Sequence, residues 1–378
     1  MSKQVNSFAD ASWVRSREKI GRMADRIGDH FPHCSEQGVY QLAEPSWWTA
    51  GFWPGLLWLI DRDQPDEQLR GIAQQCEESL DGPLQAFERL DHDLGFMWSL
   101  TSVAQYKLLG TPASKRRALT AASHLAGRFN IQGRYIRAWN PWWEGNDNSG
   151  YAIIDCLMNM PLLYWASEVT GDPRFRHVAM AHTDTTLKHF IRTDGSVHHI
   201  IRFDPDTGEA VEAIGGQGYA AESAWSRGTA WALYGLTLGY KYTKNEDYLS
   251  AAKKVAHFFI ANLPADGVPE WDFRLPTSFE RKGLKDSSAG ACAASALLEL
   301  SRLVTPEEAD VYYRHGAQLL RSLDERCGTW DVPEEEGLLR HGTGNYPEGR
   351  YIDVSLIYGD YFFVEGLAKL RGQTELFW

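Results

Sequence analysis

The sequence predicts an all-α protein folded as an (α/α)6 barrel, in which six helical hairpins close into a double ring. Three observations lead to this prediction: six segments are apolar on every side, six others are amphipathic and charged, and the two kinds alternate along the chain. A helix that is apolar all round is buried, whereas an amphipathic helix lies at the surface with one inward stripe. The apolar helices therefore form the inner ring. We expect residues 1–378 to make a single domain, because no Ser-, Gly- or Pro-rich linker interrupts them.

The inner helices are expected in six nearly uncharged segments: 51–60, 94–106, 156–166, 228–240, 287–298 and 361–370. The outer helices are expected in charged segments such as WVRSREKIGRMADRI and NEDYLSAAKKVAHFFIANL. The turns TGDPRF, TKNEDY and TPEEAD each join an inner helix to the next outer helix and supply helix-capping residues. The spacing of the apolar segments varies too widely for a solenoid repeat. Residues 196–212 are expected to form a small hairpin with its turn at Asp204–Gly208.

Because all six inner helices run the same way, their N-terminal ends should share one mouth, and two carboxylates stand out there. Asp93 ends the run Asp91-His92-Asp93, just before the second apolar helix, where an aspartate often acts only as a helix cap. Asp155 lies inside the apolar stretch YAIIDCLMNM, which favours its protonated form and a role as general acid, or else a buried structural role. Paired carboxylates across a cleft are the usual equipment for glycosidic chemistry.

Basic and aromatic residues are expected to bind the substrate beside these carboxylates. Arg227, between Trp225 and Trp231, offers a donor fork for a carboxylate, or a salt bridge to one of the mouth aspartates. His92 and His199 are candidate proton carriers, although a lone histidine is more often structural. The sequence alone does not decide between His199 and the adjacent His198. The chain has 15 tryptophans, and those of the entry segments suit sugar stacking better than the core: Trp48, Trp139, Trp142 and Trp143.

Composition excludes several classes of protein. The formal net charge of −12 argues against binding to nucleic acid or to an anionic membrane. No stretch approaches the roughly 20 apolar residues of a membrane span, and the N-terminal residues contain no apolar core of a signal peptide. The five cysteines are scattered without a CxxC pair, which favours a reduced, cytoplasmic setting over disulfides or zinc. No motif for a metal, nucleotide or other cofactor is present, and we expect a monomer or a homodimer.

Five motifs follow one another in a specific order: FPHCSEQGVY from Phe31, LDHDLGFMWSL from Leu90, IIDCLMNMPLLYWA from Ile153, GGQGYAAESAWSRGTAWALYG from Gly215 and IYGDYFFVEGL from Ile357. In their joint order and spacing they resemble family 88 of the glycoside hydrolases, the unsaturated glucuronyl hydrolases. The resemblance covers nearly the whole chain. It implies an (α/α)6 barrel that releases a 4,5-unsaturated uronic acid from the non-reducing end of lyase-generated oligosaccharides.

The resemblance also implies roles for individual residues. Asp155 matches the family's general acid/base, which protonates C4 of the double bond while water adds at C5, and Asp93 matches its second essential aspartate. Gln217 and Arg227 match contacts near the uronate carboxylate and the reacting carbon, His199 matches a substrate contact, and Trp48 and Trp225 match stacking positions. Further contacts are expected from a group that aligns less closely: His92, Trp139, Trp231 and Tyr346.

Two departures from the family and three alternative functions remain. Ala50 stands where some members carry Asp, and the stretch LDHDLG is one residue shorter than its family counterpart. One alternative is the related family 105, the unsaturated rhamnogalacturonyl hydrolases. Another is a sugar 2-epimerase on the same barrel, although that chemistry needs paired histidines and this mouth is led by aspartates. The third is a glycan-binding barrel without catalysis.

Overall fold

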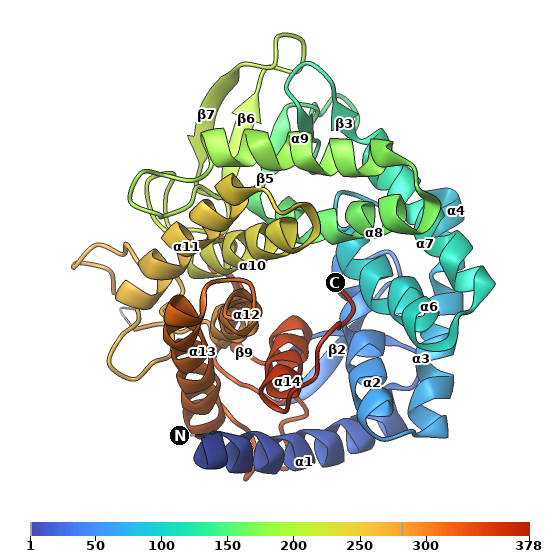
Figure 1. Cartoon of the computed structure of the whole chain (residues 1–378), viewed down its shortest axis with the longest axis vertical. Helices are drawn as coiled ribbons and strands as arrows, with labels where there is room; N and C mark the ends of the chain where they lie inside the picture. Colours follow the sequence, from blue (N-terminus) through green and yellow to red (C-terminus); the bar gives the residue numbers. More distant parts are fainter. Residues whose placement is uncertain (1, 281–282) are drawn as a thin grey trace.

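The computed structural model describes residues 2–280 and 283–378 and confirms the predicted (α/α)6 barrel (Figure 1). In this described part, the inner ring consists of six helical segments: α2 (Phe52–Asp63), α5 (Leu94–Trp98) continued by η2 (Ser99–Val103) and α6 (Ala104–Leu109), η3 (Ile154–Asn159) with α8 (Met160–Thr170), α10 (Ser226–Thr243), α12 (Ser287–Leu300) and α14 (Ile357–Leu370). The outer ring consists of α1 (Ser2–Ile27), α3 (Glu67–Ser79), α7 (Pro112–Gly127), α9 (Pro173–His189), α11 (Glu246–Ala261) and α13 (Pro306–Arg326).

Burial follows the apolar and amphipathic patterns of the sequence. Every residue of α12 and of α14 is buried, although α14 carries three charged side chains. In α11, by contrast, the buried residues form one stripe, and the charged residues lie on the other side. The ring closes because α14 packs against α2 on one side and against α12 on the other. The apolar content of a segment therefore decides the ring in which it lies.

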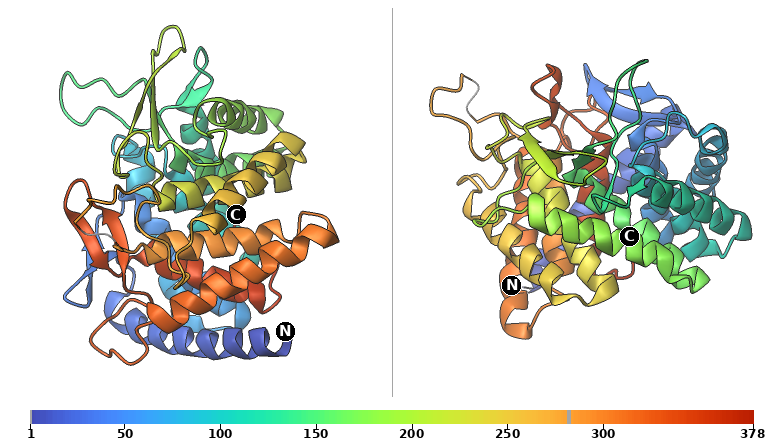
Figure 2. Two further views of the ribbon diagram at one scale, coloured as in Figure 1. Left: turned by 90° about the vertical axis from the view of Figure 1, so that its left-hand side faces the viewer. Right: turned by 90° about the horizontal axis from the view of Figure 1, so that it is seen from above.

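Small antiparallel sheets lie in the connections that lead from outer to inner helices, and Figure 2 shows them gathered at one end of the barrel. They are β1 (Phe31–Glu36) with β2 (Val39–Ala43), β3 (Phe129–Asn130) with β4 (Tyr135–Ile136), β5 (Tyr151–Ile153) with β6 (Ile200–Phe203) and β7 (Ala210–Ile214), and β8 (Gly342–Asn345) with β9 (Arg350–Val354). The predicted hairpin is confirmed as β6–β7. Its pairing with β5 was not predicted from the sequence.

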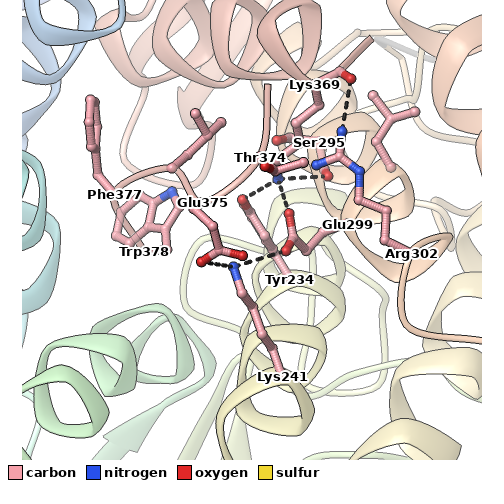
Figure 3. Close-up of polar contacts among 12 residues, drawn as sticks. Tyr234, Lys241, Ser295, Glu299, Arg302, Lys369, Thr374, Glu375, Phe377 and Trp378 are labelled. Carbon is pink, nitrogen blue, oxygen red and sulfur yellow. Dashed lines mark hydrogen bonds and ion pairs between the residues drawn. The ribbon is translucent and has the colours of Figure 1, made fainter. Parts of the chain in front are cut away.

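The last residues of the sequence fold back into the other end of the barrel (Figure 3). The indole of Trp378 is 3% exposed, stacks on Phe362 with 6.0 Å between ring centroids, and donates from Nε1 to Glu365 Oε2 at 2.6 Å. The ammonium of Lys369 lies 3.1 Å from Glu299 Oε2 and 3.5 Å from Glu365 Oε1. Buried carboxylates need such partners, because an unpaired buried charge is costly.

Among the described residues, no helix combines the length and the apolar character needed to cross a membrane.

The ion pairs of Lys369 give a stability prediction. Lys369→Met removes the cation and leaves Glu299 and Glu365 buried together, so the free energy of unfolding should fall by about 3 to 5 kcal/mol. Urea unfolding followed by circular dichroism measures this loss. The control is Lys241→Met, which removes the ammonium 3.2 Å from Glu299 Oε1 at a site 20% exposed, and which should cost clearly less. Equal costs for the two variants would contradict the prediction.

Candidate active site

Asp93 occupies the N-cap position of α5, but its carboxylate does not cap the helix. Its Oδ1 accepts a hydrogen bond from Asn159 Nδ2 at 3.1 Å and lies 3.4 Å from His92 Nε2. Asp286, at the start of α12, shows the alternative, because its carboxylate accepts from the backbone N–H of Ser288. Asp93 is therefore more than a helix cap: its carboxylate faces the neighbouring inner helix.

Asp155 lies in the first turn of η3, and the β5–β6 pairing brings His199 to it. Ile153 pairs with Ile200, and the amide of Ile154 donates to the carbonyl of His199 at 3.0 Å. As a result, His199 Nε2 lies 3.5 Å from Asp155 Oδ1, a buried oxygen that accepts no hydrogen bond from the described residues. This oxygen therefore keeps an unused acceptor position.

The neighbouring histidine points elsewhere. His198 Nδ1 lies 3.0 Å from the carbonyl of Ala221, and its ring contacts the guanidinium of Arg192. Of the two adjacent candidates, His199 is thus the one that faces the carboxylate.

The prediction that apolar surroundings favour the protonated form of Asp155 is wrong for the free protein. Burial acts to raise the pKa of Asp155, but the neighbouring His199, followed by the charges of His92 and Arg227, outweighs it and lowers the pKa. The sequence shows the apolar neighbours along the chain. It does not show these three polar side chains, which the fold brings from other segments.

Asn159, a residue that sequence reasoning missed, joins the two aspartates. Its Nδ2 contacts Asp93 Oδ1 and also lies 3.5 Å from the backbone carbonyl of Asp155, while its Oδ1 accepts from the amide of Phe96 at 2.8 Å. This approach requires glycine at position 95, because a Cβ there would stand 2.3 Å from the Cα of Asn159. A polar residue four positions after Asp155, within an apolar run, was the available signal.

Arg227 is buried, and its four terminal N–H groups are already engaged. Nη1 donates to Asp286 Oδ2 and to the carbonyl of Thr343, and Nη2 donates to Gln217 Oε1 at 2.7 Å and to the carbonyl of Gly344. The salt bridge to a mouth aspartate, one of the two roles expected for Arg227, is therefore formed. The guanidinium N–H groups that were expected to bind a substrate carboxylate are therefore occupied. Arg227 acts on the site through its charge and through Gln217.

The backbone that follows β7 holds Gln217 next to His199. The amide of Gln217 donates to His199 Nδ1 at 3.0 Å, and the His199 ring lies 4.4 Å from the ring of Trp225. Gly216 has a φ of +56°, and a Cβ there would stand 2.2 Å from His199 Nδ1. Only glycine fits between these two side chains.

The predicted aromatic residues divide into three groups. Trp48 is partly buried against Phe96 and Tyr358, and Trp225 lies under the guanidinium of Arg227 at 4.5 Å. Trp231 is 1% exposed and packs in the core, so in this structure its ring has no surface for a sugar. The other two lie in mouth segments: Trp139 beside Trp142, and Tyr346 with its ring 4.6 Å from that of Trp271.

The residues best suited to hold a metal are Asp91, His92 and Asp93, whose ligand atoms lie within 4.8 Å of one another. These atoms already serve one another and their neighbours. Asp91 Oδ1 accepts from the amide of Asp93 at 2.9 Å, and Asp93 Oδ1 accepts from Asn159. The absence of a metal remains a prediction from the sequence.

Two neighbouring carboxylates at the aromatic mouth of an (α/α)6 barrel, those of Asp93 and Asp155, are the equipment expected of a glycoside hydrolase. A family model described as Glycosyl Hydrolase Family 88 matches residues 19–242, and the chain belongs to this family. The predicted resemblance is thereby confirmed.

Relatives cover the chain almost end to end. An unsaturated glucuronyl hydrolase of Bacillus sp. (strain GL1) is 37% identical over 94% of this chain and 95% of its own. An unsaturated chondroitin disaccharide hydrolase of Streptococcus pyogenes serotype M1 is 34% identical over 94% of this chain and 89% of its own. The crystal structure of the unsaturated glucuronyl hydrolase from Bacillus sp. GL1 superposes with a TM-score of 0.91 at 36% identity, over 100% of this chain and 99% of that one.

The polar side chains around Asp155 give a prediction that needs no substrate. His199→Phe keeps a ring of similar shape but removes the imidazole Nε2 that lies 3.5 Å from Asp155 Oδ1, so the pKa of Asp155 should rise in the free protein. Carbon-13 NMR of the labelled aspartate carboxyl groups measures it, with Asp155→Asn used to assign the signal. His198→Phe is the matched control and should leave this pKa in place. A pKa that does not move in His199→Phe would contradict the assigned cause.

Proposed function

We propose that this enzyme removes a 4,5-unsaturated uronic acid from the non-reducing end of oligosaccharides by hydrating the C4=C5 double bond. The observation that carries the proposal is the buried Oδ1 of Asp155, which accepts no hydrogen bond from the described residues and lies 3.5 Å from His199, near the charges of His92 and Arg227. Such surroundings complement a substrate that is itself an anion. The names of the relatives point to the same substrate class.

The proposed reaction needs one acid and one positioned water. Asp155 donates a proton to C4, water adds its oxygen to C5, and the remaining water proton returns to a carboxylate at the site. The resulting hemiketal opens at the ring oxygen, and the neighbouring sugar leaves C1 as an alcohol. Asp93, held by Asn159 and His92, assists by orienting the water. An enol ether is already activated, so general acid catalysis accounts for the step without a further nucleophile.

Binding of the substrate raises the pKa of Asp155, which is low in the free enzyme, so that this carboxyl group can carry a proton. The pKa of Asp155 is lowered chiefly by His199, with smaller contributions from His92 and Arg227. A uronate carboxylate placed among these cations would neutralise part of their charge and displace water. Both effects raise the pKa of a neighbouring carboxyl group. Asp155 would thus take up its proton when the correct anion is bound.

A cavity of about 890 Å³, whose lining includes neither Asp93 nor Asp155, offers room for the leaving part of the oligosaccharide. Its wall includes His33, Gln41, Trp47, Arg89 and Tyr351. His33 connects it to the site, because its ring contacts that of Trp48, and burial followed by the charge of Arg227 lowers the pKa of His33 to about 4. A neutral His33 can accept a hydrogen bond from Trp47 Nε1, at 3.3 Å, and so fixes this half-exposed indole in the wall.

The hairpin on the other side of this cavity is backbone-strained. His341, Tyr351 and Asp353 all have positive φ angles, of 66°, 56° and 59°. Such conformations are unfavourable for residues other than glycine and gather at ligand sites. The His341 imidazole contacts the Asp353 carboxylate at 2.6 Å and holds two of these residues together. Of these three residues only Tyr351 lines the cavity, and its strained backbone supports a binding role for this wall.

We also propose a cytoplasmic location, which five unpaired, buried cysteines support. The alternative function, that of an unsaturated rhamnogalacturonyl hydrolase, differs in its pectin-derived substrate. The activity assay described next should therefore include such a substrate.

The first experiment is to follow ultraviolet absorbance of the conjugated C4=C5 group in a panel of lyase-generated disaccharides. The wild type should remove the absorbance, and Asp155→Asn should lower kcat/KM by about 10³-fold, the usual effect of losing a general acid. Asp206→Asn, in the exposed β6–β7 turn, is the matched control and should be fully active. A wild-type trace that stays flat on every disaccharide would overturn the proposed reaction and favour an epimerase or a binding protein.

The cavity gives a separate prediction about chain length. Trp47→Ala should raise KM for a tetrasaccharide by about fivefold, corresponding to about 1 kcal/mol of lost ring stacking. KM for the disaccharide should change little, because the shorter substrate fills less of this wall. Phe87→Ala, an exposed aromatic on His124 outside the cavity, serves as the control. Equal changes for both substrates would show that Trp47 acts through the site and not through a subsite.

A further inference from the structure

We propose that Asp272 is a positioning residue of this reaction, which folds residues 215–225 so that Gln217 reaches His199. The Gln217 amide then holds the His199 ring with its Nε2 proton directed at Asp155. The effect on turnover rests on the proposed function, but the geometry can be tested in the free protein. Asp272 lies in the connection from α11 to α12, and its side chain is fully buried.

The Asp272 carboxylate accepts four hydrogen bonds. Its Oδ2 accepts from the amide of Tyr219 at 3.0 Å and from the hydroxyl of Ser223 at 2.6 Å. Its Oδ1 accepts from the amides of Ala224 and Arg274, both at 2.9 Å. Three of the four donors lie 48 to 53 positions earlier in the sequence, so the carboxylate does more than form a local turn. It joins two distant connections of the barrel.

Trp271 adds a contact directly on Gln217. The indole Nε1 of Trp271 donates to the carbonyl of Gln217 at 3.1 Å, and the ring is fully buried. An antiparallel bridge pairs Trp225 with Asp272, and the amide of Ser226 donates to the carbonyl of Trp271 at 3.0 Å. The two neighbouring residues therefore hold the segment both near its start and at its end.

Arg192 also holds this segment, but only in its later part. Its Nη1 donates to the carbonyl of Ser223 and its Nη2 to the carbonyl of Ala221, both at 2.7 Å. Both carbonyls follow Gln217 in the chain. Loss of the Asp272 carboxylate should therefore release the part of the segment that carries Gln217, while Arg192 retains the rest.

The Gln217 amide decides which nitrogen of the His199 ring carries the proton. This amide donates to His199 Nδ1 at 3.0 Å and has no other acceptor among the described residues. Nδ1 also lies 3.2 Å from the carbonyl of Gly215, but that carbonyl accepts from the amide of Gly218 at 2.9 Å and is satisfied without the ring. Nδ1 is therefore the acceptor, and a neutral His199 carries its proton on Nε2. This Nε2 lies 3.5 Å from Asp155 Oδ1.

This tautomer of His199 suits the proposed reaction. When Asp155 has given its proton to C4, its carboxylate needs a donor, and the Nε2–H group of the ring is directed at it. In the other neutral tautomer, Nε2 would present a lone pair to the same oxygen and repel the carboxylate. Asp272 acts on this choice through the position of Gln217.

The first test is Asp272→Asn, whose single carbonyl oxygen cannot accept from all four donors. Nitrogen-15 NMR of the His199 ring is recorded in the free protein at a pH at which the ring is neutral, and His199→Phe assigns the signals. The proton should lie on Nε2 in the wild type and be shared between the two nitrogens in the variant. The value of kcat/KM on a 4,5-unsaturated disaccharide should fall by about 10²-fold, the usual cost of a small misplacement at a reacting group.

A second variant and a control complete the test. Trp271→Phe removes the indole donor to Gln217 but keeps an aromatic ring, so it should shift the tautomer in the same direction. Asp61→Asn is the matched control, because Asp61 is 5% exposed and accepts from the amide of Asp66 at 2.8 Å in the last turn of α2, at the opposite end of that helix from the mouth. It should lower stability without changing the His199 tautomer.

An unchanged His199 tautomer in folded Asp272→Asn would overturn the proposal, whatever the activity of this variant. Where Asp272→Asn does not fold, Trp271→Phe decides in the same way. If the wild type turns over no disaccharide, the NMR measurement still decides the positioning role, and only the proposed function fails.

Discussion

The contact on which this site depends is the hydrogen bond from Asn159 to Asp93. It ties the start of α5 to the end of η3, two neighbours in the inner ring, and so relates the carboxylate of Asp93 to the backbone of Asp155. A side-chain amide can do this because its nitrogen donates to one carboxylate while its oxygen accepts from the Phe96 backbone. Both ends of the amide are satisfied, which is the condition for placing a polar group so deep in an apolar ring.

The fold and the two aspartates could be predicted from the sequence, because both depend on the order of apolar and polar residues within short segments. The apolar run at 287–298 became the fully buried α12, and the run at 228–240 became α10, which is buried except at its C-terminal end. Because the N-terminal ends of the inner helices share one mouth, the predicted helix starts also indicated that Asp93 and Asp155 lie there. What could not be predicted was every relation that joins distant segments: β5 beside β6, Asp286 beside Arg227, and His199 beside Asp155. Such pairings leave no periodic trace along the chain.

The same limit explains the wrong prediction for Asp155. Its neighbours in sequence are apolar and would favour a neutral carboxyl group, but its neighbours in space include His199 and Arg227. The occupied fork of Arg227 shows how the charge is kept there without substrate, since Asp286 and two backbone carbonyls hold the guanidinium in place. The positive charge is thus preorganised before the anion arrives, and little reorganisation is left for the moment of reaction.

Strain and stability are separated along the barrel axis. The backbone angles of His341, Tyr351 and Asp353 are unfavourable, and all three residues lie in or beside the β8–β9 hairpin at the mouth. The opposite end is closed by Trp378 and by the ion pairs of Lys369, which fill the space between the inner helices (Figure 3). Strained conformations persist only where the surrounding structure holds them in place. For the hairpin that support is local, because the His341 imidazole contacts the Asp353 carboxylate and the Tyr351 ring packs edge-on against His33 with 4.7 Å between ring centroids.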